Sequence, residues 1–140
     1  MKFIAFLIAI SAITSANAVA DEVTPTPAPP GASVYIISPA NGETVPTTFT
    51  VRFGLKGMGV APAGVEKINT GHHHLLIDGK ALPAASAPMG TEVKHFGGGQ
   101  TETELTLEPG KHTLQLILGD KTHVQHNPPV VSQKIEITVK

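Results

Sequence analysis

The sequence has no cysteine and no tryptophan, and only one tyrosine among its 140 residues. Without cysteine, the chain forms no disulfide, thiolate zinc cluster, iron–sulfur site or thiol nucleophile. It also has few aromatic side chains for stacking on sugars or anchoring a protein interface. Neither sign of charge is in excess, because 10 Lys and Arg face 11 Asp and Glu. A near-neutral chain has no basic field, so we expect no nucleic-acid partner.

Long apolar runs are missing as well, apart from one near the N-terminus. A positive start at Lys2 precedes a nearly uninterrupted apolar stretch over residues 3–13, and small residues follow as two overlapping Ala-x-Ala sites at 16–18 and 18–20. This order is typical of a cleaved secretory signal, and the apolar stretch is too short for a membrane anchor of about 20 residues. We therefore expect residues 1–20 to be removed during export, after residue 18 or 20. The mature protein is expected to be periplasmic or secreted, with no stable membrane insertion.

The rest of the chain divides into a short linker and one domain. Residues 21–32 are rich in proline, threonine and alanine, which favours an extended tether. Residues 33–140 are expected to form a single histidine-rich domain. Apolar and polar residues alternate with a period of two over 49–55, 114–118 and 131–139, and no segment has a helical apolar stripe. About six or seven such strands predict an all-β, immunoglobulin-like antiparallel β-sandwich, with a small β-barrel as the alternative.

The histidines are the unusual feature of the domain. All seven lie between residues 72 and 126, and the densest group is His72-His73-His74. On a strand, His72 and His74 project from one face, while His73 joins Leu75 and Ile77 on the other. Two imidazoles at this spacing lie about 7 Å apart at Cα, close enough to reach one ion. The alternative is that both are solvated on an exposed face.

Other parts of the chain can complete a metal site. We predict that His72, His74, His95 and His123 bind a metal ion, with His126 as a reserve ligand. An all-nitrogen set suits Cu(II), Zn(II) or Ni(II), and the Irving–Williams order favours copper, so copper is the expected cofactor and zinc the alternative. Binding needs neutral imidazoles, so affinity is expected to fall as the pH drops through about 6.5.

Five further residues have expected roles around this site. His73 is expected to be structural, and His112 to be partly buried beside the core. Asp120 could accept a hydrogen bond from a ligand imidazole and orient it. Met58 and Met89 lie on Gly-rich turns, where their thioethers would favour Cu(I) or simply make loop contacts.

Several segments together resemble the exported bacterial family labelled domain of unknown function 4399. The resemblance covers about Val34 to Val139 and rests on Gly71–Asp78, His95–Gly97, Gly99–Glu102, Leu107–Leu116, Gly119–Asp120 and Pro128–Ser132. It implies export and a β-rich domain, but no activity. A weaker likeness is to copper–zinc superoxide dismutase, whose sandwich also carries a His-x-His strand. This chain lacks that enzyme's disulfide cysteines and any clear set of residues for a two-metal site, so its activity is not carried over.

Three functional hypotheses follow from these observations. The first is a periplasmic metal-binding protein, a copper carrier or buffer whose expected partners are the metal ion and another periplasmic protein. The second is a non-catalytic β-sandwich module that recognises an envelope component or a protein partner. The third is a metal-dependent enzyme of the dismutase or hydrolase type. Hydrolysis would need a carboxylate base beside the metal, and Asp78 is already explained by its turn with Gly79. We expect a binding role rather than a catalytic one.

Overall fold

The computed structural model describes residues 23–140, which form strands and turns. The predicted signal, residues 1–20, lies outside the described residues. Within residues 23–140 no helix has the length and apolar character needed to cross a membrane.

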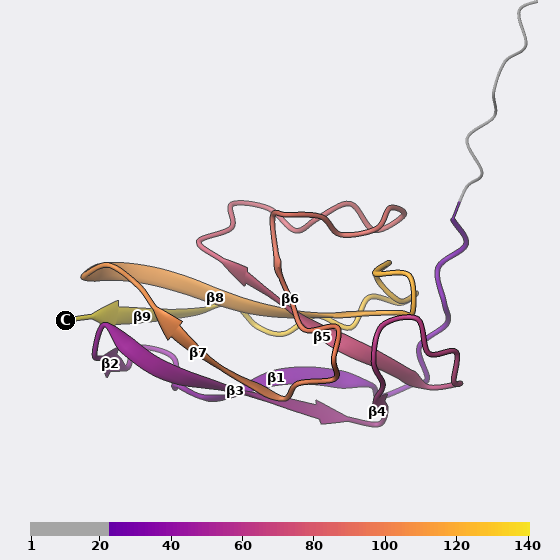
Figure 1. Cartoon of the computed structure of the whole chain (residues 1–140), viewed down its shortest axis with the longest axis horizontal. Helices are drawn as coiled ribbons and strands as arrows, with labels where there is room; N and C mark the ends of the chain where they lie inside the picture. The colour runs from indigo at the N-terminus through magenta and orange to yellow at the C-terminus, as the bar shows by residue number, and fades with distance from the viewer. Residues whose placement is uncertain (1–22) are drawn as a thin grey trace, which may run out of the picture.

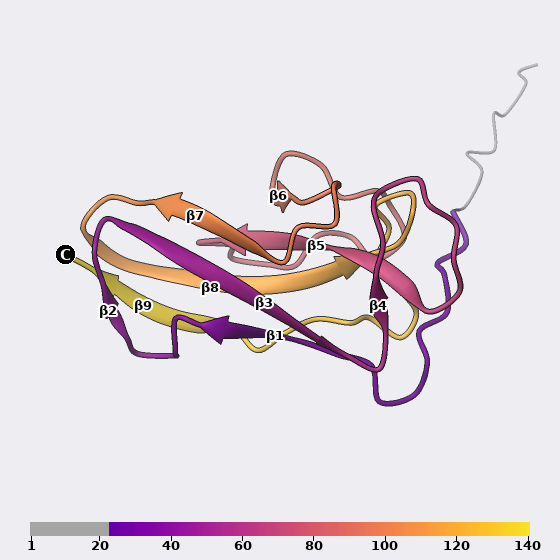
Figure 2. The same cartoon turned by 60° about the horizontal axis from the view of Figure 1, so that its bottom comes forward.

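Nine strands form two sheets in the described part of the chain (Figures 1 and 2). The smaller sheet has the order β1 (Ser33–Ser38), β3 (Thr48–Lys56), β7 (Glu102–Thr106). The larger sheet has the order β2 (Thr44–Val45), β9 (Ile135–Val139), β8 (Gly110–Gly119), β5 (Thr70–Ile77), β4 (Gly59–Val60), and β6 (Lys94–His95) also pairs with β5. Neighbouring strands are antiparallel except the short pairs β2/β9 and β4/β5. The two sheets do not close on each other, so the predicted β-sandwich is confirmed and the barrel alternative is wrong.

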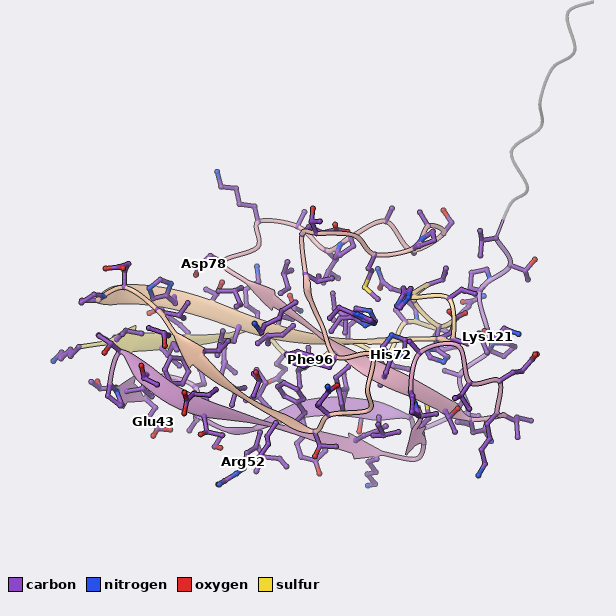
Figure 3. All side chains as sticks on the ribbon, in the orientation of Figure 1. Glu43, Arg52, His72, Asp78, Phe96 and Lys121 are labelled. Carbon is purple, nitrogen blue, oxygen red and sulfur yellow. The ribbon has the colours of Figure 1, made fainter. Side chains whose placement is uncertain are left out.

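The main core lies between the two sheets. Alternation along β3 turns Phe49, Val51 and Phe53 inward, as their period of two predicts. They meet inward-facing residues of the larger sheet, among them Leu75, Leu114, Leu116, Leu118 and Ile137. Each such apolar side chain stabilises the fold by about 1.5–3 kcal/mol when fully buried. The outward-facing residues of β3 are polar or glycine, and Arg52 projects away from the sandwich there (Figure 3).

A second apolar cluster lies on the outer face of the larger sheet. Leu76 and Ile117 alternate with the inward residues of β5 and β8, and they pack with Met89 and Val93. Both of these come from the long segment between β5 and β6, which folds back over the sheet (Figure 1). The larger sheet is therefore covered on both faces. We call the segment over its outer face, residues 78–101, the cover; it encloses a buried space for polar side chains.

Two segments differ from their expected structures. The last strand begins at Ile135 rather than near Val131, which makes only an isolated bridge to Ile117. The Ser132 hydroxyl accepts from the Leu116 amide at 2.8 Å, in the place that a backbone carbonyl takes in a regular ladder. Residues 26–28, within the predicted tether, lie against the domain and form a parallel bridge with Asn127.

Candidate metal centre

Two members of the candidate site come from β5. His72 and His74 point to the outer face of the larger sheet, as strand alternation predicts. They are 0% and 1% exposed, because the outer cover encloses them. The alternative that they are solvated on an open face is therefore wrong. His72 lies toward the start of β5, and Asp78 lies just past its end (Figure 3).

The other two members come from β6 and from the loop after β8. His95 lies on β6, where it is the direct cross-strand partner of His74. Directly opposed residues of an antiparallel pair project on the same side, so this register brings the two imidazoles together. His123 lies in the loop that follows β8, with a positive φ of 67°. His95 is exposed and His123 is intermediate, so the site has a buried side and an accessible side.

The four imidazoles converge on one point. Each of His72, His74, His95 and His123 offers one ring nitrogen, and these four atoms all lie within 4.8 Å of one another. Nε2 of His72 lies 3.0 Å from Nδ1 of His123 and 3.1 Å from Nε2 of His95. The ring centroids are 4.4–5.8 Å apart.

The two short nitrogen–nitrogen distances are close to those around a single ion. Nitrogens bound at about 2.0–2.1 Å lie about 3.3–3.4 Å apart around a tetrahedral ion and about 2.8–3.0 Å apart when adjacent in a square plane. The two short contacts of His72 fall between those values. The widest separation of 4.8 Å exceeds both geometries, so a small inward shift would complete the shell.

Unsatisfied ring nitrogens support the same interpretation. Nδ1 of His72 and both ring nitrogens of His74 are buried and have no hydrogen-bond partner among the described residues. A buried polar atom without a partner costs free energy, so native structures seldom leave several together. A metal ion would take one nitrogen from each ring; it would therefore satisfy one of the two orphaned nitrogens of His74, and the residues present fit such an ion.

The electrostatics of the cluster favour the neutral form of its two buried imidazoles. Burial first, and then the neighbouring imidazoles, lower the pKa of His72 to about 4 and that of His74 to about 3. Burial and the nearby His123 also lower the pKa of His95. Neutral imidazole is the form that binds metal, so protonation of His72 and His74 competes with the metal at a pH well below the expected 6.5.

Asp120 supports the site in a different way from the one predicted. It makes no hydrogen bond to an imidazole; instead its Oδ1 accepts from the amides of Thr122 and Val124 and from the Thr122 hydroxyl, at 2.8–3.1 Å. Burial would raise the pKa of Asp120, but these bonds and one from Thr26 outweigh it and lower the pKa. The sequence signal for this role is Asp120-Lys121-Thr122, because Asp commonly accepts from the amide two residues on. Asp120 thus shapes the loop that carries His123.

The remaining histidines lie outside the cluster. His73 faces the core, with its ring 5.1 Å from that of Phe53, so its predicted structural position is correct. The reserve ligand His126 is buried elsewhere, with ring nitrogens 3.3 and 3.4 Å from the carbonyls of Thr70 and Leu118. His112 is partly buried as expected, and Asp78 accepts from its Nδ1 at 2.7 Å.

The two methionines have different surroundings. Met58 packs against the main core, away from the cluster. Met89 belongs to the outer apolar cluster and lies beside His74, since a Cβ added at Gly119 would meet both side chains. Gly119 therefore leaves room for the His74 ring, a role that sequence reasoning missed.

Fold and site together define a β-sandwich domain with a buried histidine cluster on the outer face of one sheet. The chain belongs to the family described as Domain of unknown function (DUF4399), whose model matches residues 51–140, and the predicted resemblance is confirmed. That range contains all seven histidines. No curated protein gives a significant match. Among solved structures, fibronectin(III)-like modules of CbhA from Clostridium thermocellum are similar at 12% identity and a TM-score of 0.38, over 76% of this chain and 92% of that chain.

Proposed function

We propose that this protein binds one Cu(II) ion through His72, His74, His95 and His123 and acts as a periplasmic or secreted copper carrier or buffer, with zinc as the alternative metal. The observation that carries the proposal is the convergence of four ring nitrogens within 4.8 Å. Imidazole nitrogens suit both ions, and the Irving–Williams order places copper ahead.

The uneven exposure of the ligands favours exchange of the metal over permanent retention. His72 and His74 are fully buried on a strand with ladder partners on both sides, while His95 is exposed on a two-residue strand. An incoming ligand from another molecule can reach the ion from the His95 side without opening the sandwich. A carrier or buffer needs such an accessible ligand.

The chemistry of the cluster favours binding over hydrolysis. Within the described residues, the four-histidine group includes no carboxylate. The nearest acidic candidate, Asp120, already accepts four hydrogen bonds from Thr26, Thr122 and Val124. Metal-dependent hydrolysis usually uses a free carboxylate as the general base beside the bound water.

A competition titration tests this proposal. The mature protein, without a histidine tag, is titrated with Cu(II) and with Zn(II) against a chromophoric chelator. We expect one ion per chain, and a loss of about 100-fold or more in affinity for His74→Ala and His95→Ala, since each removes a ligand. His112→Ala is the matched control, because it removes a histidine outside the cluster. Millimolar affinity of the wild type, or equal affinities for all three variants, would contradict the proposal.

One observation favours the second hypothesis, a recognition module. Tyr35 and Ile37 are 47% and 56% exposed, and they share one face of β1, an edge strand of the smaller sheet. A partner could pack on this pair independently of the metal. If the titration fails, this hypothesis becomes the leading one, and alanine substitution at Tyr35 would be its first test.

A further inference from the structure

The N-terminal segment of the described chain lies against the loop that carries His123. The Asn127 amide donates to the Thr26 carbonyl and the Ala28 amide donates to the Asn127 carbonyl, both at 3.0 Å. The Thr26 hydroxyl donates to Oδ2 of Asp120 at 2.7 Å. Asp120 is only 3% exposed, so the segment lies over a buried carboxylate rather than on open surface.

That carboxylate joins the segment to the loop that holds His123. Its Oδ2 accepts from Thr26, while its Oδ1 accepts from Thr122 and Val124, the two residues that flank His123. The backbone adds two bonds, from the His123 amide to the Asp120 carbonyl at 2.9 Å and from the Asp120 amide to the Val124 carbonyl at 2.8 Å. Asp120 therefore connects the His123 loop to Thr26, which lies 94 positions before Asp120 in the sequence.

The loop needs this support because of its backbone conformation. His123 has a φ of 67°, in the left-handed region that non-glycine residues adopt only when the surrounding contacts hold them there. Its carbonyl accepts from the Met89 amide at 2.9 Å, which ties the loop to the segment covering His74. A change in the support at Asp120 would therefore move His123 relative to the ligands on β5.

We propose that Thr26 is a positioning residue for the metal site, and that the segment Thr26–Ala28 holds the His123 loop in its metal-binding conformation through Asp120. The inference rests on the proposed metal-binding function. If Thr26 is removed, Oδ2 of a buried carboxylate loses its donor, and Asp120 is freer to turn toward solvent and release the loop. Undocking of this segment releases His123 while the sheet ligands stay in place, so the segment controls how long the ion is retained.

The test compares variants of the mature protein loaded with Cu(II). Thr26→Val keeps the shape of the side chain but removes the hydroxyl, and Thr26→Ser restores it. The matched control is Thr48→Val, which breaks the exposed Thr48–Thr106 hydroxyl pair of the smaller sheet. Dissociation of the ion is followed by stopped flow with excess EDTA, and the copper coordination by electron paramagnetic resonance.

We expect Thr26→Val to release copper about 10-fold faster than the wild type, at the lower end of the effect of groups that support metal ligands. Its resonance spectrum should change, while Thr26→Ser and Thr48→Val stay within about twofold of the wild type. Equal rates for Thr26→Val and the wild type would overturn the inference, as would an equal acceleration in Thr48→Val. A wild type that binds no copper is a separate result, because it overturns the proposed function and the inference with it.

Discussion

Three adjacent histidines of β5 have one side-chain chemistry and two different environments. His72 and His74 meet other imidazoles on the outer face, whereas His73 packs against Phe53 in the core. The sequence predicts this division, because alternation on a strand depends only on position. It does not predict that both faces are buried, because the cover over the outer face is an irregular segment whose path no hydrophobic period specifies. Nor does it predict Thr26, which acts through a contact 94 residues away.

The first prediction concerns the stability of the metal-free protein. Burial lowers the pKa of His72, His73 and His74 to about 4, 4 and 3. Between about pH 6.5 and pH 4 the unfolded chain therefore binds more protons than the folded chain, so stability is full above about 6.5 and falls as the pH drops. We expect the melting temperature of the chelator-treated protein to decrease across this window.

His73→Leu should weaken that pH dependence. Both ring nitrogens of His73 are buried without a partner among the described residues, and leucine fills a similar volume with no proton to gain. At pH 5 we expect the variant to have a higher melting temperature than the wild type. The free energy of unfolding should be larger by an amount on the order of 1–3 kcal/mol. Copper affinity should stay within about threefold. A variant that loses copper binding as His74→Ala does would show that His73 has been misassigned.

Gly119 gives a third prediction at this scale. A Cβ there would lie 2.5 Å from Cε1 of His74 and 3.0 Å from Cε of Met89, too close for either to remain in place. We expect Gly119→Ala to lower metal affinity by about 10-fold or more, in the range seen for residues that orient ligands. Gly59→Ala is the control, because its Cβ would meet Thr70 at an ordinary 3.5 Å. Equal affinities for the two variants would be inconsistent with the crowded His74 ring.

Elements differ in how far the sequence predicts them. β3 and the middle of β8 follow from the alternation over 49–55 and 114–118, and their inward residues form the core as expected. β6 has only two residues, so it carries no period, and its pairing with β5 comes from the fold of the whole cover. The loop after β8 is defined by side-chain bonds to Asp120 rather than by hydrophobic pattern. Half of the metal site therefore lies on elements that the sequence cannot place.

This difference predicts which elements respond to metal. The cover contacts the larger sheet through the histidine cluster, through the short β5–β6 ladder, and through the packing of Met89 and Val93 on the outer face. Removing the metal should therefore increase amide hydrogen exchange in the cover (residues 78–101) and in residues 120–126, with little change in β3 and β8. Mass spectrometry of exchange with and without copper measures this. Uniform protection across the domain would indicate that the metal binds elsewhere.

At the scale of the whole molecule, a strand inside the larger sheet carries two of the candidate ligands, and a short strand and a loop carry the other two. The domain has no cysteine, so its stability rests on the main core between the sheets and on the outer cluster. The family model matches residues 51–140, which include all the candidate ligands and most of the larger sheet but not β1 or β2, and the expected export signal lies outside that range.

Export remains a prediction from the first twenty residues. We expect the exported protein to begin at Val19 or Asp21, since the small residues at 16–20 form two overlapping cleavage sites. Intact-mass spectrometry of the periplasmic fraction checks this. A protein that retains Met1 to Ala20 would rule out the proposed processing.

The central claim is that four histidines on the outer face of the larger sheet, from β5, β6 and the loop after β8, bind one ion. Anomalous diffraction from crystals of the copper-loaded mature protein, with data on both sides of the copper absorption edge, tests it most directly. We predict one copper ion per chain, bonded by ring nitrogens of His72, His74, His95 and His123 at about 2.0–2.1 Å. A copper ion bound at other residues, or a fully occupied site that leaves His72 and His74 unbound, would contradict the account.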